Sequence, residues 1–351
     1  MTRKLFDPKT VFVRGDETPP RVLAAPQRYI QGPGVIDRTG RYISSLMDVT
    51  RAGILASKRG LGAQGAQIAQ SLKAESIESV NAEFSGECSL IEIENQVANL
   101  ADQKLDCLIA VGGGKVADAG KAIAHRLGVP GIVVPTLAST DAPCSALSLL
   151  YTEDGVKDYV EFFPRSPEMV IVDTDVVANA SERYLVAGIG DAMATWYEAR
   201  VCLANPAARN MVGARPTLAS CAMGEICAHA LFENGEAAAA AVLTNENNEA
   251  VEKVVEANTL LSGVGFESGG LALAHAMAVA YTEVDVVNQN YLHGEMVAMG
   301  TMAQLAMEQS EDAEKVARFF ARVGLPINLE QLSLSPQSKS EFETLLEATL
   351  E

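Results

Sequence analysis

The sequence predicts an α/β domain with a parallel sheet, followed by an all-α domain. Short apolar segments alternate with helical segments from residue 28 to about residue 180, which favours a parallel sheet covered on both faces. Beyond Ser181 the strand signals stop and only helical patterns follow. A chain of 351 residues, 48% of them hydrophobic, can bury the cores of two such domains.

Three segments make up the chain in this interpretation. Residues 1–27 contain four prolines and no periodicity, so we expect an extended arm or a flexible leader. Residues 28–180 form the α/β domain, starting with an edge strand at 28–30 that Gly32-Pro33-Gly34 stops. The other strands are expected at 52–56, 80–84, 108–111, 131–135 and 169–172, with helices at 35–47, 62–73, 91–100 and after Gly114.

The remaining elements complete both domains. Residues 145–151 and 159–163, separated by a turn that contains Gly155, predict a β-hairpin at the sheet edge. Residues 181–351 form the helical domain, in which the alanine cluster at 237–241 belongs to a packed helix. Its helices are expected near 182–202, 213–233, 246–263, 270–281, 294–309, 312–323 and 339–350.

A turn of three glycines, Gly112 to Gly114, follows the apolar strand that ends at Val111. Such a turn lets the backbone approach an anion, and the following helix N-terminus attracts phosphate. The expected ligand is a nucleotide diphosphate. The turn is neither the common dinucleotide fingerprint, which needs glycine at Ala117, nor a P-loop, which needs Ser or Thr at Val116. A turn that only packs its helix on the sheet stays open as the alternative.

A loop rich in small hydroxyl side chains follows the strand that ends at Pro135. Ligands of open α/β sheets bind beyond the carboxyl ends of the strands. We therefore expect this loop and the glycine turn to line one crevice, which the helical half closes.

The charge balance disfavours a polyanionic partner. With 27 Lys and Arg against 45 Asp and Glu, the net charge is −18, so nucleic-acid binding is not expected.

The six cysteines are scattered without C-x-x-C spacing and are interpreted as reduced thiols of a cytoplasmic protein. No apolar run is long enough for a membrane span, and no secretory signal is evident.

Three residues of the helical half are candidate metal ligands. Asp191 lies in an apolar segment and needs a partner if it is buried, and His275 and His293 each lie close to a helix end. One carboxylate and two imidazoles leave a coordination position open, as in catalytic divalent sites. Core histidines with ordinary partners are the alternative. His125 and His229 are interpreted as structural.

Long stretches of the sequence then carry a resemblance to a known family. They are RYIQGPG at 28–34, GEC at 86–88, GGGK at 112–115 with Asp118, PTLASTDAPCSALS at 135–148, MVIVDT at 169–174, AGIGDAMATWYEAR at 187–200, VVEANTLLSGVGFESGGLALAHA at 254–276 and YLHGEMVAMGT at 291–301. Together they resemble the glycerol dehydrogenases, the zinc-dependent polyol branch of the iron-containing alcohol dehydrogenase superfamily.

The resemblance implies the dehydroquinate synthase-like fold, with NAD and zinc in the cleft between a nucleotide-binding and a metal-binding domain. It implies an enzyme that oxidises glycerol or a related vicinal diol by hydride transfer from a metal-bound alkoxide. A homo-oligomer is expected. It matches the zinc ligands to Asp191, His275 and His293, and the polyol contact to Asp141. The matched cofactor contacts are Gly113, Gly114, Lys115, Asp118, Thr136, Ser139, Ser145, Leu147 and Tyr151.

Two departures from the family pattern concern the cofactor and the metal. Relatives usually have an aspartate at the position of Ser57, where an acidic side chain favours NAD, so NADP use is possible here. Ala278, Gln289 and Asn290 stand where many relatives have further histidines, which favours Zn²⁺ over Fe²⁺. The chain ends at Glu351 within a predicted helix where relatives usually continue.

Two other functions share this fold. A glycerol-1-phosphate dehydrogenase or dehydroquinate synthase would need basic residues near the metal, but residues 187–198, 265–278 and 288–296 contain no Lys or Arg. A degenerate, non-catalytic member that binds nucleotide is the other alternative.

Overall fold

The computed structural model describes residues 5–334, which form two compact units. The first unit contains residues 5–8, 24–137 and 142–179, and the second contains residues 9–23, 138–141 and 180–334. Most of the segment expected to be a separate arm therefore belongs to the second unit. So does the short segment 138–141, which lies far from the helical half in the sequence.

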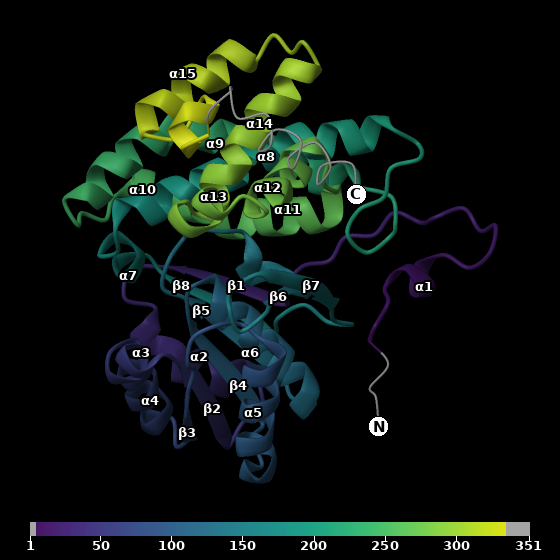
Figure 1. The fold of residues 1–351 in the computed structure, drawn as a ribbon. Coiled ribbons are helices and arrows are strands. Elements are labelled where there is room, and N and C mark those ends of the chain that lie inside the picture. Colours follow the sequence, from purple (N-terminus) through teal and green to yellow (C-terminus); the bar gives the residue numbers. More distant parts are fainter. Residues whose placement is uncertain (1–4, 335–351) are drawn as a thin grey trace. The chain divides into compact units, whose positions relative to one another are not determined.

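A six-stranded parallel sheet forms the first unit, as predicted (Figure 1). Its spatial order is β1-β8-β5-β4-β2-β3, so β1 is an edge strand as expected. The pairing of Gly112 with Pro135 brings the ends of β4 and β5 side by side. The strands are β1 Arg28–Gly32, β2 Arg51–Ala56, β3 Glu78–Glu83, β4 Cys107–Gly112, β5 Gly131–Pro135 and β8 Met169–Asp173.

Helices cover both faces of this sheet (Figure 1). Alternate strand residues divide between two hydrophobic cores, with Ile54 and Ile109 in one and Leu55 and Leu108 in the other. The first core includes residues of α2 (Thr39–Leu46) and α4 (Gln64–Ala74). The second includes residues of α5 (Leu90–Leu100) and α6 (Gly114–Leu127). This arrangement explains why the four inner strands, β2, β4, β5 and β8, are apolar runs, whereas the edge strands β1 and β3 contain polar residues.

Three details of the first unit differ from the expectation. The hairpin of β6 (Leu147–Tyr151) and β7 (Lys157–Phe162) forms a separate two-stranded sheet, so its assignment to the edge of the main sheet was wrong. The helix expected at 62–73 is divided at Ala63 into α3 (Lys58–Gly62) and α4. The helix expected at 35–47 begins as a 3-10 turn, η1 Ile36–Arg38, before α2. A short helix, α7 Thr174–Ala178, follows β8.

Helices form most of the 180–334 part of the second unit. Thr217 caps α9 five residues later than expected, and this helix continues through the alanine cluster at 237–241. A π-helical turn, η4, joins α10 to α11. The elements are α8 Glu182–Ala204, α9 Leu218–Leu243, α10 Glu249–Glu256, η4 Ala257–Leu261, α11 Ser262–Gly269, α12 Leu273–Thr282, α13 Asp285–Asn290, α14 His293–Met307, α15 Ala313–Val323 and η5 Leu329–Leu332.

The 9–23 segment contains one helical turn, α1 Lys9–Phe12, and an extended part. The extended part is hydrogen-bonded to residue Arg215, whose N–H donates to Pro20 O at 2.7 Å and whose carbonyl accepts from Val22 N at 3.2 Å.

Among the described residues, no helix has the length and hydrophobicity of a membrane span. The helix predicted at 339–350 lies outside the described residues.

Candidate functional site

Asp191, His275 and His293 come together in the second unit. Each offers one ligand atom, and these atoms all lie within 4.8 Å of one another. Asp191 Oδ1 is 3.5 Å from Nε2 of His275 and 3.5 Å from Nε2 of His293. Asp191 is fully buried, whereas the His293 side chain is 41% exposed. The cluster therefore has one closed side and one accessible side.

Close packing of helices places these three side chains. Asp191 lies in the middle of α8, His275 in the first turn of α12, and His293 is the first residue of α14. Gly294 allows α14 to begin directly against α8, because a Cβ at Gly294 would lie only 1.8 Å from Ala187 O. The close approach at Gly294 thus brings the preceding residue, His293, near α8.

The carboxylates and imidazoles of the cluster stabilise one another's charged forms. Burial alone would raise the pKa of Asp191, but His293 and His275 outweigh it, so this pKa lies below its usual value. Burial alone would lower the pKa of His275, but the carboxylates of Glu198 and Asp191 raise it well above its usual value. Asp191 Oδ1 has no hydrogen-bond partner among the described residues although it is buried.

Such an orphaned carboxylate oxygen, with two imidazole nitrogens around it, fits a divalent cation. Two ligands at about 2.0–2.1 Å from a tetrahedral zinc ion lie about 3.4 Å apart. The two 3.5 Å separations between Asp191 Oδ1 and the imidazole nitrogens agree with that geometry.

Sequence reasoning missed Glu198, which is fully buried and contacts His275. Its Oε2 atom lies 2.5 Å from His275 Nδ1. A signal was present, because Asp191 and Glu198 are seven residues apart and seven residues are two helical turns, so both face the same side of α8.

Asp141, the expected polyol contact, is buried beside the same cluster. Its N–H donates to Asp191 Oδ2 at 3.3 Å, and its Oδ2 accepts a hydrogen bond from Ser262 Oγ at 3.2 Å. Asn258, in the π-helical turn, donates to Ala138 O at 2.9 Å and so holds the other end of segment 138–141. Ser139 lies in this segment, half-buried.

The glycine turn lies in the first unit at the start of α6. Gly113 is the N-cap residue and Gly114 the first helical residue. Thr136 N donates to Gly112 O at 3.0 Å, so the loop after β5 begins beside this turn. Lys115 is largely exposed, pairs with Glu87, and lies 5.9 Å from the centre of the Tyr151 ring. An exposed cation next to a helix N-terminus suits a phosphate group.

Asp118 has mainly structural contacts in the described residues. Its carboxylate lies 2.9 Å from Lys121 Nζ and accepts a hydrogen bond from Leu149 N at 3.1 Å. Lys121 also donates to Ser145 Oγ at 3.2 Å. Asp118, Lys121 and Ser145 are buried, and so is Leu147 on β6. These contacts attach the β6–β7 hairpin and Ser145, which precedes it, to α6, the helix that follows the glycine turn.

Ser57 lies at the carboxyl end of β2, where it caps α3. Its Oγ accepts a hydrogen bond from Gly60 N at 3.1 Å, and its side chain is exposed. The next two residues, Lys58 and Arg59, are exposed as well. This local surface is basic where a cofactor ribose is expected.

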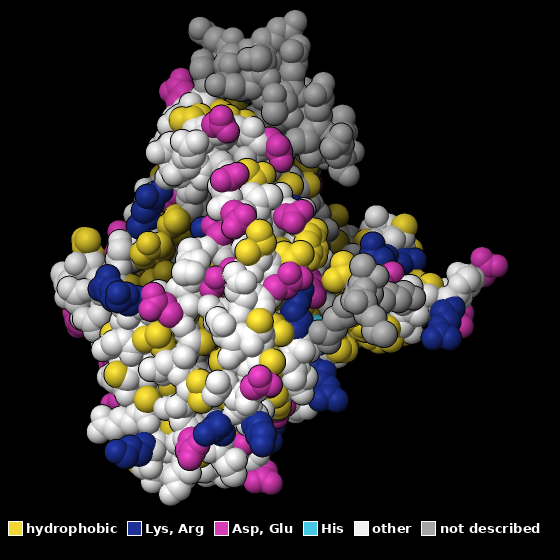
Figure 2. Space-filling view, turned by 60° about the horizontal axis from the view of Figure 1, so that its bottom comes forward, with side chains coloured by type: hydrophobic (Ala, Val, Ile, Leu, Met, Phe, Trp, Pro, Cys, Tyr) yellow, Lys and Arg dark blue, Asp and Glu magenta, His cyan; other side chains and the backbone are white. Residues whose placement is uncertain are grey.

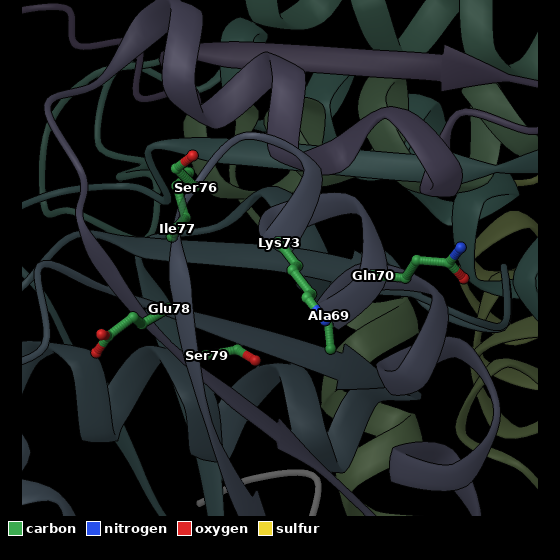
Figure 3. A pocket seen from close by; sticks show the side chains of 7 residues that line it. All are labelled: Ala69, Gln70, Lys73, Ser76, Ile77, Glu78 and Ser79. Atoms are coloured by element: carbon green, nitrogen blue, oxygen red, sulfur yellow. The ribbon is translucent and has the colours of Figure 1, made fainter.

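Other features lie apart from these residues. The ring of His125 packs against that of Phe163, with the centroids 5.3 Å apart and the planes tilted by 50°, in keeping with a structural role, while His229 is exposed on α9. Figure 3 shows a surface pocket of about 830 Å³ in the first unit, lined by Ala69, Gln70, Lys73, Ser76, Ile77, Glu78 and Ser79. This pocket contains none of the predicted cofactor contacts. On the face in Figure 2, basic side chains are dispersed among acidic ones.

Comparison with known proteins identifies the family. The model of the iron-containing alcohol dehydrogenases matches residues 26–174. Glycerol dehydrogenase of Escherichia coli O6:H1 is 43% identical over 330 residues, which cover 93% of this chain and 89% of the relative. Glycerol dehydrogenase of Pseudomonas putida is 42% identical, with 93% and 89% covered.

A solved structure agrees with these relatives. The crystal structure of glycerol dehydrogenase from Schizosaccharomyces pombe superposes with a TM-score of 0.91 at 34% identity, covering 96% of this chain and 86% of that one. Three observations indicate the same family: the fold, the similarity over nearly the whole chain, and the grouping of Asp191, His275 and His293. The protein therefore belongs to the glycerol dehydrogenase family of iron-containing alcohol dehydrogenases and is an oxidoreductase.

Proposed function

We propose that this protein oxidises glycerol, or a related vicinal diol, to the hydroxyketone with NAD as hydride acceptor. Full-length similarity to glycerol dehydrogenases supports this substrate class. In the balanced reaction, the secondary carbon loses a hydride to the oxidised nicotinamide and its hydroxyl loses a proton. The cytoplasm is the proposed compartment, since all six cysteines are free thiols.

The observation that carries the proposal is the buried, orphaned Oδ1 of Asp191 between two imidazoles. We propose that Asp191, His275 and His293 hold a divalent cation, with zinc favoured over iron by the nitrogen and oxygen donor set and by Ala278, Gln289 and Asn290. When bound, the cation supplies Lewis acidity that lowers the pKa of the alcohol hydroxyl. Asp141 would orient the substrate by accepting a hydrogen bond from its second hydroxyl.

The first unit would bind the dinucleotide. Gly113, Gly114 and the helix start offer backbone N–H groups to the diphosphate, and exposed Lys115 offers a positive charge. Thr136 and Tyr151 lie on the adjoining segments, while Asp118, Ser145 and Leu147 hold the hairpin behind them. Ser139 is proposed as the cofactor contact from the 138–141 segment.

Phosphorylated substrates are not favoured, because the segments that carry the three candidate ligands, 187–198, 265–278 and 288–296, contain no Lys or Arg. Arg183 is paired with Glu295 at 2.7 Å and also donates to Asn290 O at 2.7 Å. A substrate phosphate at the candidate metal site would need a basic side chain within these segments. A non-catalytic member of the family would not need the orphaned Asp191 oxygen.

A steady-state assay tests the proposal. Glycerol and 1,2-propanediol are each oxidised with NAD and with NADP, before chelation, after it, and after zinc is restored. We expect turnover that is lost on chelation and recovered with zinc. Asp191→Ala should abolish turnover while leaving dinucleotide binding intact, and normal turnover by this variant would refute the metal assignment. We also predict that the protein is a homo-oligomer, and its molar mass from light scattering tests this.

A further inference from the structure

One carboxylate, that of Glu198, holds both the ring and the backbone of His275. Glu198 Oε2 lies 2.5 Å from His275 Nδ1. Its other oxygen, Oε1, accepts hydrogen bonds from Ala272 N at 2.7 Å and from His275 N at 3.0 Å. The carboxylate is fully buried, so water cannot replace these partners.

The start of α12 depends on side chains from other helices. Its N-cap residue, Ala272, has no side chain that could accept from the first N–H groups. Glu198 of α8 accepts from two of them, and Gln304 of α14 accepts from a third, Ala274 N, at 3.1 Å. Glu198 therefore sets where the helix begins and, through it, where the His275 backbone lies.

The same contact decides which ring nitrogen of His275 is free. A carboxylate only accepts hydrogen bonds, so the bond to Glu198 keeps a proton on Nδ1. In the neutral ring the lone pair is then on Nε2. Nε2 is the atom that lies 3.5 Å from Asp191 Oδ1.

We propose that Glu198 is a positioning residue of the metal site, which fixes the rotation of His275 and presents its Nε2 lone pair to the cation. This inference rests on the metal assignment proposed above. It assigns a role to a residue outside the ligand set, and partners of this kind typically contribute 10–100-fold to metal affinity.

Glu198→Gln is the most discriminating variant because it is isosteric. Two backbone N–H donors face Oε1, so the amide oxygen is expected there, which turns the NH₂ group toward His275 Nδ1. Nδ1 must then accept, and the proton moves to Nε2, where it blocks a metal bond. The matched control is Gln304→Ala. This change removes a hydrogen bond to the same helix start but leaves the contact between Glu198 and the His275 ring in place.

The measurement is the zinc dissociation constant of metal-free protein, obtained by competition with a chromophoric chelator. We expect Glu198→Gln to weaken zinc binding about 10–100-fold, while Gln304→Ala keeps the wild-type affinity. Melting temperatures in excess chelator show whether each variant is folded. Glu198→Asp, one methylene shorter, serves as the second variant if Glu198→Gln does not fold, and it should weaken zinc binding in the same direction.

The outcomes separate this inference from the proposed function. If wild type binds zinc and Glu198→Gln or folded Glu198→Asp binds it equally well, the positioning role is refuted. An equal loss in Glu198→Gln and Gln304→Ala would also refute it, because the effect would then come from the helix start alone. If wild type binds no zinc, the metal assignment fails, and this inference with it.

Discussion

The hydroxyl of Ser262 donates a hydrogen bond to Asp141 Oδ2 at 3.2 Å, and Ser262 Oγ also lies 2.8 Å from Thr195 Oγ1. A hydroxyl has one proton, so Thr195 must donate to Ser262 for both bonds to form. All three side chains are buried. Helices α8 and α11 therefore orient the carboxylate that we propose to contact the polyol.

Ser262→Ala should reduce discrimination in favour of diols. Its hydrogen bond is to a carboxylate, and such bonds contribute about 1.5–3 kcal/mol. Because Asp141 would lose its orientation, kcat/KM for glycerol should fall by about tenfold or more, with a smaller loss for 2-propanol. Thr301→Val, which removes a buried hydroxyl bonded within α14, is the control. An equal loss for both alcohols would contradict the role of Asp141.

Gly188→Ala should displace the segment that carries Asp141. A Cβ at Gly188 would lie 1.9 Å from Ala138 O and 2.4 Å from Asn258 Nδ2, so the hydrogen bond between these groups must break. We expect a folded protein with strongly reduced glycerol oxidation. Gly62→Ala, at which a Cβ meets no atom within 4 Å, should keep full activity. Circular dichroism and kcat/KM together distinguish displacement from unfolding.

Asp118→Asn should destabilise the protein even without cofactor. The change leaves the charge of Lys121, whose side chain is only 3% exposed, without its ion-pair partner, at a cost of about 3 kcal/mol. Lys115→Met breaks an exposed ion pair and should cost at most about 1 kcal/mol. Urea unfolding in the absence of nucleotide makes the comparison. Unchanged stability of Asp118→Asn would show that Asp118 serves the cofactor alone.

Ser57→Asp should shift the cofactor preference toward NAD. Aspartate caps a helix as well as serine does, so α3 should be preserved. The added carboxylate can bond a ribose hydroxyl but repels a 2′-phosphate. The ratio of kcat/KM for NAD to that for NADP on glycerol should therefore rise above the wild-type ratio. Strict NAD preference of the wild type would refute relaxed cofactor choice.

Much of the fold could be predicted from the sequence because its signals are local. The inner parallel strands are apolar runs, and Gly114 marks the start of α6 correctly. The hairpin 147–162 was recognised, but its separation from the main sheet was not, because strand periodicity does not identify the neighbouring strand. The division at Ala63 was also missed, although Gly62 precedes it and Gly65 follows it, because single glycines within a helical pattern are often tolerated.

The sequence identified residues of the candidate site, but it did not identify the contacts between them. Asp191, His275 and His293 were named from the sequence and the family resemblance, and the structure brings them together. Glu198, Ser262 and Asn258 act through helices that meet only in the tertiary structure. Their polar side chains in apolar segments were the available signal, because a buried polar group requires a partner.

The most direct test of the metal site is anomalous scattering at the zinc absorption edge from crystals of zinc-reconstituted, active protein. We expect one strong peak within bonding distance of Asp191 Oδ1 and of Nε2 of His275 and His293. Crystals of Asp191→Ala, grown in the same way, should lack this peak. Active wild-type crystals with no peak at these three residues, or with zinc bound elsewhere, would contradict the metal assignment.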